Sequence, residues 1–221
     1  MSIESTLQDE YRRRFDAAAT YRDKVWQILC ADFFARFVYP EHCILDLGCG
    51  WGEFSNNIKA AKKYAMDLNP DARRHLGPDV EFLQQDCSNP WPLPGGSLDV
   101  VFSSNFLEHL PDKSAITATL RHAHSALKPG GTIALLGPNV RFVPGDYWDF
   151  WDHHVPLSER SIAEALELTG FEVVQKLDRF LPYTMSDGRR APLVLVKAYL
   201  RMPWAWRYFG KQFLVIAKKR V

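Results

Sequence analysis

The chain has 221 residues, a formal net charge of +1, 47% hydrophobic residues and 24% charged residues. This composition is typical of a soluble globular domain, and it excludes a disordered or fibrous chain. The balanced charge gives no overall field that would attract nucleic acid, so we expect no nucleic-acid partner.

Targeting and redox signals are weak along the whole chain. Acidic residues precede the first apolar run, so we expect no signal peptide, and no stretch of about 18 uncharged apolar residues exists to span a bilayer. The four cysteines form no C-x-x-C pair and have no histidine at zinc-finger spacing, so we expect reduced thiols. These features predict a cytoplasmic protein without a bound metal.

A long N-terminal helix is predicted to precede an alternation of short strands and helices. Apolar side chains recur at spacings of three, four or seven over residues 3–38, which predicts a helix that Pro40 ends. The predicted strands are residues 43–47, 64–68, 80–84, 98–103, 132–136, 171–177 and 213–218. The predicted helices among them are residues 52–61, 71–76, 112–127 and 159–169, and Lys128-Pro129-Gly130-Gly131 closes the third.

Repeated strand and helix units predict an α/β fold with a doubly wound, seven-stranded, mostly parallel sheet. We assign residues 1–40 to an N-terminal helical cover and 41–180 to the ligand-binding core. Residues 181–210 form a basic aromatic insertion that caps the substrate, and 211–221 form the last strand of the core. Ligands of such sheets bind at the carboxyl ends of the strands, so we expect the site at that edge.

A glycine-rich turn, Asp46-Leu47-Gly48-Cys49-Gly50-Trp51-Gly52, follows the first predicted strand and opens the next helix. Such a turn brings the backbone and the free N–H groups of a helix N-terminus close to a ligand. A nicotinamide-binding G-x-G-x-x-G turn would have its third glycine where Glu53 stands. S-adenosylmethionine carries an ammonium and a sulfonium, which acidic residues suit. We therefore favour the methyl donor and keep a dinucleotide-dependent oxidoreductase as an alternative.

Four further motifs make the chain resemble the class I, Rossmann-like, S-adenosylmethionine-dependent methyltransferases over roughly residues 41–180. They are Asp67 with Gln85-Asp86-Cys87, the strand Gly96 to Asn105, Leu107-Glu108-His109-Leu110, and Leu127-Lys128-Pro129-Gly130-Gly131. The resemblance implies that Asp67 binds both ribose hydroxyls, that Asp86 contacts the adenine amino group, and that the end of the fourth strand lines the methionine part. The donor-binding residues predicted in this way are Asp46, Gly48, Cys49, Gly50, Gly52, Asp67, Leu68, Asp86, Cys87 and Ser103.

Each acidic residue of this set also has a structural alternative. Asp67 could cap the turn that follows it, and Asp86 could serve an ordinary turn at a strand end. Asp46 could be a purely structural loop carboxylate. Trp51 could cover the donor or pack on the first helix.

A methyl acceptor with a hydroxyl group must lose a proton, and histidine is the usual base near neutral pH. His109, Asp146 and His153 are therefore the candidate catalytic residues, although His109 could also be structural. The loop over residues 137–156 is dense in aromatic, acidic and imidazole side chains, which favours an acceptor pocket, with packing or a metal site as alternatives. The candidate acceptor-binding residues are Asn139, Tyr147, Trp148, Trp151 and His154.

From Gly188 to Val221 the chain has nine Lys or Arg residues and no Asp or Glu, mixed with tryptophans and aliphatic residues. This pattern predicts peripheral contact with an anionic membrane or a pocket for a phosphorylated substrate, and the alternative is an amphipathic cap with solvated charges. The sequence makes no prediction of oligomeric state.

The tail and the aromatic loop together resemble small bacterial methyltransferases associated with cell-surface sugars. This second resemblance implies O-methylation of a sugar or lipid-linked sugar hydroxyl by a cytoplasmic protein that contacts the inner face of the membrane. A donor-binding but catalytically silent regulatory module is the other alternative.

Overall fold

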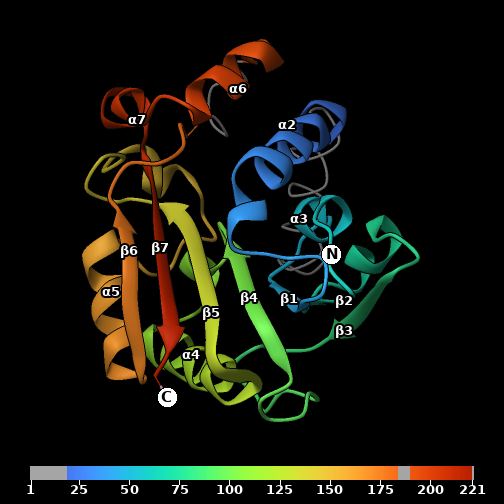
Figure 1. The fold of residues 1–221 in the computed structure, drawn as a ribbon. Coiled ribbons are helices and arrows are strands. Elements are labelled where there is room, and N and C mark those ends of the chain that lie inside the picture. Colours follow the sequence, from blue (N-terminus) through green and yellow to red (C-terminus); the bar gives the residue numbers. More distant parts are fainter. Residues whose placement is uncertain (1–18, 184–189, 221) are drawn as a thin grey trace, which may run out of the picture.

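A seven-stranded sheet organises the part of the chain that the computed structural model describes, which is residues 19–183 and 190–220 (Figure 1). The strands are β1 (Cys43–Leu47), β2 (Lys62–Asp67), β3 (Val80–Gln84), β4 (Leu98–Ser104), β5 (Leu127–Pro138), β6 (Phe171–Leu177) and β7 (Gln212–Lys219). They lie in the order β3-β2-β1-β4-β5-β7-β6. The first five pair in parallel, and β7 runs antiparallel between β5 and β6. This arrangement confirms the predicted α/β fold.

Helices cover both faces of the sheet. They are α2 (Ala19–Asp32), α3 (Glu53–Asn57), α4 (Lys113–Ala126), α5 (Glu159–Leu168), α6 (Leu193–Leu200) and α7 (Pro203–Phe209). Short 3-10 turns are η1 (Phe34–Arg36), η2 (Pro70–His75), η3 (Leu107–His109) and η4 (Asp146–Asp149). None of the helices described here is long and apolar enough to cross a lipid bilayer.

Two buried clusters, one on each face, hold these layers together. Successive side chains of a strand point to opposite faces, so Val101 of β4 packs toward α4 and α5, whereas Val100 and Phe102 pack toward α2 and α3. The Phe102 ring stacks on Phe54 of α3 with 3.8 Å between ring centroids. Trp26 of α2 meets the Phe102 ring edge-on at 5.9 Å. These aromatic contacts hold α2 and α3 against β4.

The largest differences between the predicted element boundaries and the structure lie in three places, and the other boundaries shift by no more than two residues. In the predicted helix over residues 3–38, residues 3–18 lie outside the described part, and α2 ends at Asp32, before η1. The predicted helix over residues 52–61 is only the short α3, which ends at Asn57. The Lys128-Pro129-Gly130-Gly131 motif does not separate a helix from a strand, because β5 already begins at Leu127.

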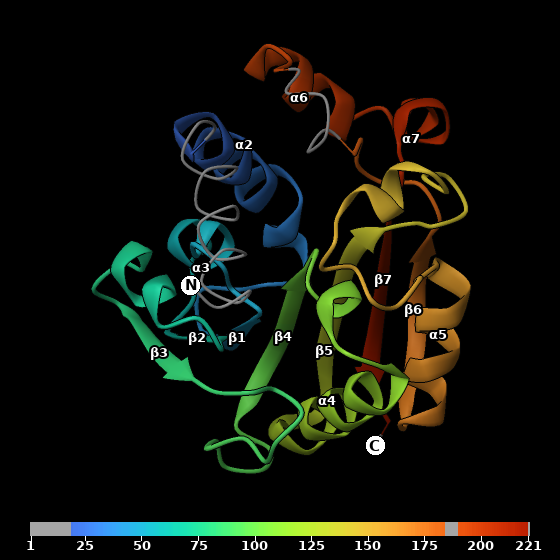
Figure 2. The same cartoon turned by 180° about the vertical axis from the view of Figure 1, so that it is seen from behind.

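The carboxyl ends of the parallel strands share one edge of the sheet with the cover and the insertion. Figures 1 and 2 agree that β4 and β5 end toward α2, α6 and α7. The insertion between β6 and β7 contributes α6 and α7 at this same end. Loops that follow β1, β2, β4 and β5 therefore converge there.

Candidate active site

A cavity of about 260 Å³ lies where these four loops meet. Its lining comes from the glycine turn after β1, the η2 region after β2, the η3 region after β4 and the loop after β5. The lining residues are Gly48, Gly50, Trp51, Asp67, Asn69, Ala72, Asn105, Phe106, His109, Asp152 and His154. The cavity therefore lies at the edge of the sheet where the sequence predicts ligand binding.

The glycine turn has a backbone that only glycine adopts readily. Gly48, Gly50 and Gly52 have φ values of 65°, 53° and 72°, in the left-handed region. The Gly48 N–H donates to the Met66 carbonyl of β2 at 2.8 Å. A Cβ atom at Gly48 would lie 2.0 Å from the ring of Phe106. The turn is thus bound to β2 and closely covered by Phe106, which lines the cavity.

Asp67 connects the glycine turn to the end of β2. One carboxylate oxygen accepts the Gly50 N–H at 2.9 Å, and the other accepts the Asn69 N–H at 2.9 Å. Burial raises the pKa of Asp67, and these backbone hydrogen bonds oppose the rise. Each carboxylate oxygen can accept more than one hydrogen bond, so both retain capacity toward the cavity. Asp67 therefore fits a ligand that presents two neighbouring hydroxyl groups.

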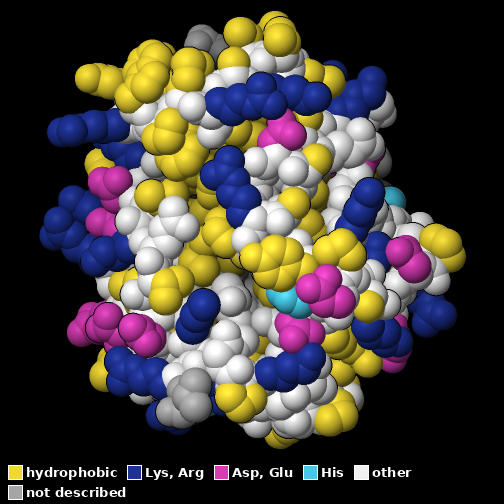
Figure 3. All heavy atoms as spheres, viewed as in Figure 1, with side chains coloured by type: hydrophobic (Ala, Val, Ile, Leu, Met, Phe, Trp, Pro, Cys, Tyr) yellow, Lys and Arg dark blue, Asp and Glu magenta, His cyan; other side chains and the backbone are white. Residues whose placement is uncertain are grey.

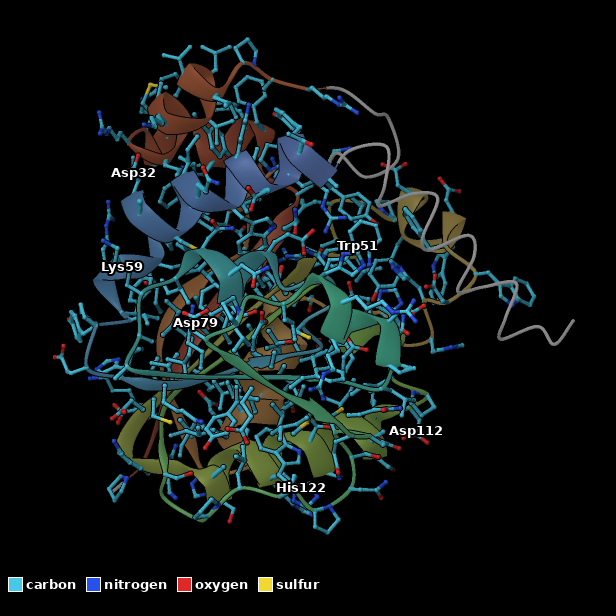
Figure 4. All side chains as sticks on the ribbon, turned by 90° about the vertical axis from the view of Figure 1, so that its right-hand side faces the viewer. Asp32, Trp51, Lys59, Asp79, Asp112 and His122 are labelled. Atoms are coloured by element: carbon cyan, nitrogen blue, oxygen red, sulfur yellow. The ribbon has the colours of Figure 1, made fainter. Side chains whose placement is uncertain are left out.

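Trp51 also lines the cavity. Its ring, labelled in Figure 4, stacks on His75 of η2 with centroids 4.2 Å apart and planes 7° apart. Trp51 thus lines the cavity with an aromatic face that is held against His75.

The other predicted donor-binding residues do not line the cavity. Some of them support the glycine turn from the protein interior, and others lie away from it. Asp46 is buried and accepts the Ser55 N–H at 3.2 Å, and burial raises its pKa to about 7. The Ser103 hydroxyl donates to the Leu47 carbonyl at 2.8 Å. Cys49 and Cys87 are buried, and burial raises the pKa of both thiols. Leu68 is exposed.

Asp86 occupies the turn that was its structural alternative. Its carboxylate accepts the backbone N–H of Ser88 at 2.9 Å and the Ser88 hydroxyl at 2.7 Å. The side chain is exposed and is not part of the cavity lining. Contact between Asp86 and an adenine ring stays a prediction.

His109 forms an ion pair with Asp152 in the cavity wall. The Nδ1 atom of His109 lies 2.9 Å from the Asp152 carbonyl oxygen and 3.3 Å from its carboxylate. Burial alone would lower the pKa of His109, but the hydrogen bond to Asp152 and the nearby carboxylates of Glu108 and Asp152 raise it to about 9. The same hydrogen bond lowers the pKa of Asp152 to about 2. At neutral pH the cavity therefore contains an imidazolium beside a carboxylate.

Glu108 and His153 lie next to His109 of the His109–Asp152 pair. Glu108 is buried, which raises the pKa of its carboxyl group, and its carbonyl accepts the His154 N–H at 2.8 Å. The His153 ring is buried between Phe150 and Tyr147. Glu108, His109 and His153 each offer one ligand atom, all within 4.8 Å of one another. A carboxylate and two imidazoles could hold a divalent metal ion here, where the sequence predicted none.

The predicted acceptor residues separate into two groups. His154 lines the cavity, and Trp148 and Trp151 are exposed on the same loop, 53% and 82% respectively. Tyr147 is fully buried, and its hydroxyl donates to the Val155 carbonyl, so it holds the loop together.

Asn139 and Asp146 lie outside the cavity lining. The Asn139 amide is buried and donates to Glu159 at 2.7 Å and to the Asp178 carbonyl at 2.9 Å. Asp146 faces Lys211 at 3.4 Å. Asn139 thus bonds within the interior and Asp146 pairs with Lys211, and a role of either residue in the reaction stays a prediction.

The site residues predicted from the sequence do not include Asp152, Asn105 or Phe106, although Asn105 ends the strand that was expected to line the methionine part. Asp152 belongs to the acidic and aromatic loop that the sequence marked, but its partner His109 lies 43 residues away. Asn105 has a φ of 49°, the kind of left-handed position that asparagine tolerates directly after a strand. That signal was visible in the run Ser103-Ser104-Asn105.

Residues 10–176 match the family model described as "Methyltransferase domain". The chain belongs to this methyltransferase domain family. S-adenosylmethionine is the methyl donor of this class, which confirms the predicted donor and leaves the dinucleotide alternative without support.

Curated relatives of this methyltransferase domain include three enzymes that differ in acceptor. The chain is 36% identical over 110 residues to the ubiquinone biosynthesis O-methyltransferase of Xanthomonas campestris, covering 46% of this chain and 45% of the relative. It is 32% identical to the 2-methyl-6-phytyl-1,4-hydroquinone methyltransferase of Synechocystis, covering 59% and 46%. It is 30% identical to the malonyl-[acyl-carrier protein] O-methyltransferase of Dechloromonas aromatica, covering 64% and 54%. The matches span about half the length of these relatives, and none of the three names includes a sugar.

Solved structures share the fold of the methyltransferase domain at low sequence identity. An S-adenosylmethionine-dependent methyltransferase from Archaeoglobus fulgidus is similar with a TM-score of 0.67 and 21% identity, covering 90% of this chain and 94% of that one. One from Mesorhizobium loti has a TM-score of 0.62 and 17% identity, covering 87% and 98%. At these identities the likeness supports the fold alone.

Proposed function

We propose that this protein transfers a methyl group from S-adenosylmethionine to a hydroxyl oxygen of a small-molecule acceptor. The observation that carries the proposal is the position of the His109–Asp152 pair, which lines the same cavity as Asp67 and the glycine turn. The candidate base and the candidate donor-binding residues therefore line the same cavity. Two of the relatives named above are O-methyltransferases, which supports a hydroxyl as the acceptor group.

The residues of the cavity fit the donor. Asp67 is half-buried and offers two carboxylate oxygens for the ribose hydroxyls, and the left-handed glycines Gly48 and Gly50 let the backbone approach closely. When bound, S-adenosylmethionine supplies a methyl group activated by the neighbouring sulfonium. Asp67 and the glycine turn hold this group in place, and alignment alone can supply much of the rate.

His109 is the base in this proposal. Asp152 engages Nδ1, which leaves Nε2 to accept the proton of the acceptor hydroxyl as its oxygen bonds to the methyl carbon. Bound S-adenosylmethionine would supply the methyl carbon, and its sulfur would keep the electron pair of the carbon–sulfur bond. His109 must be neutral to act, and its pKa of about 9 means that the active fraction grows as the pH rises toward that value.

For the acceptor we propose a sugar hydroxyl, either free or linked to a lipid. The support is the pair of exposed indoles, Trp148 and Trp151, on the loop that carries Asp152 and His154. Aromatic faces of this kind stack on sugar rings. A lipid-linked acceptor would also require the protein to approach a membrane.

The test combines an acceptor screen with a pH profile. Labelled donor is offered with free sugars, lipid-linked sugars and quinol precursors, and label transfer to any sugar-containing fraction is the expected result. Label confined to the quinols would replace the sugar with a phenolic acceptor. Donor-analogue binding without any transfer would favour the silent regulatory module.

With a working acceptor, kcat of the wild type should rise with pH and level off above about pH 9. Asp152→Asn removes the carboxylate that raises the pKa of His109, so the rising limb should move to lower pH. Asp146→Asn, whose side chain lies outside the cavity lining, is the matched control and should leave the profile in place. A His109→Gln variant that retains wild-type kcat would overturn the assignment of the base.

A further inference from the structure

Helices α6 and α7 present large apolar side chains to solvent. The exposed fractions are 70% for Val194, 56% for Leu195, 64% for Trp204, 72% for Tyr208 and 63% for Phe209. Single exposed apolar residues are ordinary on a protein surface, but a cluster of them on two consecutive helices marks an interaction site. We call these five residues, together with Lys197, Arg201 and Arg207, the α6–α7 ridge.

The ridge is the outer side of helices that are firmly packed on their inner side. Trp206 is buried against Phe180 with 5.1 Å between ring centroids, and its indole N–H donates to the Tyr199 carbonyl at 2.9 Å. The Tyr199 hydroxyl donates to the Phe180 carbonyl at 2.7 Å. The apolar residues of the ridge are therefore held outward by a folded support.

Basic side chains are interleaved with the apolar ones. Lys197, Arg201 and Arg207 are exposed, and none of them joins an ion pair with another described residue. The sequence has no Asp or Glu after Asp187. Between α2 and α6 a groove with Lys24 and Lys197 on its walls repeats the combination of cations and aliphatic surface. Cations beside tryptophan and aliphatic side chains are the composition of helices that lie in a membrane interface.

The ridge lies at the functional end of the molecule. Strands β4 and β5, whose following loops help to line the cavity, end toward α2, α6 and α7 in both views (Figures 1 and 2). Figure 3 shows hydrophobic and basic side chains together along this upper end. A surface that contacts the ridge would therefore face the end of the sheet at which ligands enter.

We propose that the α6–α7 ridge docks the protein on the surface of a bilayer that contains anionic phospholipids. The apolar side chains enter the interface, and Lys197, Arg201 and Arg207 pair with lipid phosphates. A second copy of the chain is the competing occupant, but two ridges in contact would place these like charges against one another. Of these two occupants, the lipid surface is the one that satisfies both the apolar area and the positive charge.

The test is flotation of the full chain with vesicles of phosphatidylcholine, with and without phosphatidylglycerol, at low and high salt. Binding to the anionic vesicles only, weaker at high salt, is the expected result. Each basic residue near such a surface contributes about fivefold to partitioning, equivalent to about 1 kcal/mol, so Lys197→Ala with Arg201→Ala should lower the partition coefficient about 25-fold. Trp204→Ser with Phe209→Ser should abolish binding at both salt concentrations.

Matched controls use residues of the same kinds elsewhere on the surface. Lys59→Ala with Lys176→Ala removes two exposed cations, and Leu168→Ser with Val174→Ser removes two exposed apolar side chains. Both control pairs should bind like the wild type. Equal binding to neutral vesicles, or equal loss in the controls, overturns the proposal. So does a dimer in sedimentation that the Trp204 and Phe209 changes dissolve. No methyl transfer is measured, so the result is independent of the proposed reaction.

Discussion

Asp67 already makes two hydrogen bonds to the protein backbone in the cavity wall. Its carboxylate holds Gly50 and Asn69, and thereby fixes the distance between the glycine turn and the end of β2. A change at this residue therefore acts on the shape of the turn and on the groups available to the donor ribose. We expect both effects to weaken the binding of the donor.

Asp67→Asn should weaken the binding of S-adenosylhomocysteine by about 1–3 kcal/mol, because the amide cannot accept all the hydrogen bonds that the carboxylate accepts. Calorimetric titration measures this change. Asp86→Asn is the control, since the Asp86 side chain is exposed and bonded to Ser88. If Asp86→Asn costs as much as Asp67→Asn, the adenine contact implied by the sequence gains support. If Asp67→Asn costs nothing, the ribose assignment fails.

Residues of the site were predictable where local sequence determines their position. The glycine turn and Asp67 follow directly from strand ends and from the backbone that a tight turn requires. Asp152 was not predictable, because its importance depends on the path of a 20-residue loop that brings it to His109. Asn139 stood out as a polar residue after a strand, but pairing with Glu159 uses its amide in the interior.

Two side chains, those of Ser158 and Ser161, cap the start of helix α5. The Ser158 hydroxyl accepts the Ser161 N–H at 3.3 Å, and the Ser161 hydroxyl accepts the Ser158 N–H at 3.0 Å. These reciprocal bonds satisfy two backbone donors at the start of the helix. The helix then buries Ile162 and Leu166 against the sheet.

Ser158→Ala should lower the free energy of unfolding by about 1 kcal/mol, the usual contribution of such a cap. Chemical denaturation measures the change. Thr117→Ala, in the second turn of α4 and only partly buried, removes a hydroxyl that donates to the Lys113 carbonyl of the preceding turn and should be close to neutral. A Ser158→Ala variant as stable as Thr117→Ala would mean that packing of Ile162 and Leu166 alone determines where α5 begins.

The predicted elements agree best where apolar periodicity and caps coincide, as in β1, β3, α4 and β6. The prediction is wrong at α3, where asparagine side chains replace the hydrogen bonds that would continue the helix. The Asn57 amide donates to Glu53 and Asp23, and Asn56 bonds to His75 and Gly77, so α3 stops at Asn57. Such distant partners leave no trace in the local pattern, which continued as helical to residue 61.

At the scale of the whole molecule, a ligand in the cavity would touch loops from four strands at once. It would bind only the folded chain, so binding and stability are linked. The identity of the stabilising ligand is therefore a test of the donor class.

S-adenosylhomocysteine at about 100 times its dissociation constant should raise the free energy of unfolding by about 2.7 kcal/mol. Denaturant titration with and without the ligand measures the increase. NAD at the same concentration is the control and should have no effect. Stabilisation by NAD alone would contradict the donor assignment, and stabilisation by neither would show that the cavity does not bind nucleosides.

The position of β7 has a consequence for how the chain assembles. During synthesis from the N-terminus, β6 and α5 are completed well before Gln212–Lys219, the strand that joins them to β5. Until then the edge of β5 lacks the neighbour that later pairs with Thr132 through Pro138. An open apolar strand edge attracts other chains. The growing polypeptide therefore passes through a stage at which this edge is open, and the sheet is completed only when β7 inserts between β5 and β6, which are already made.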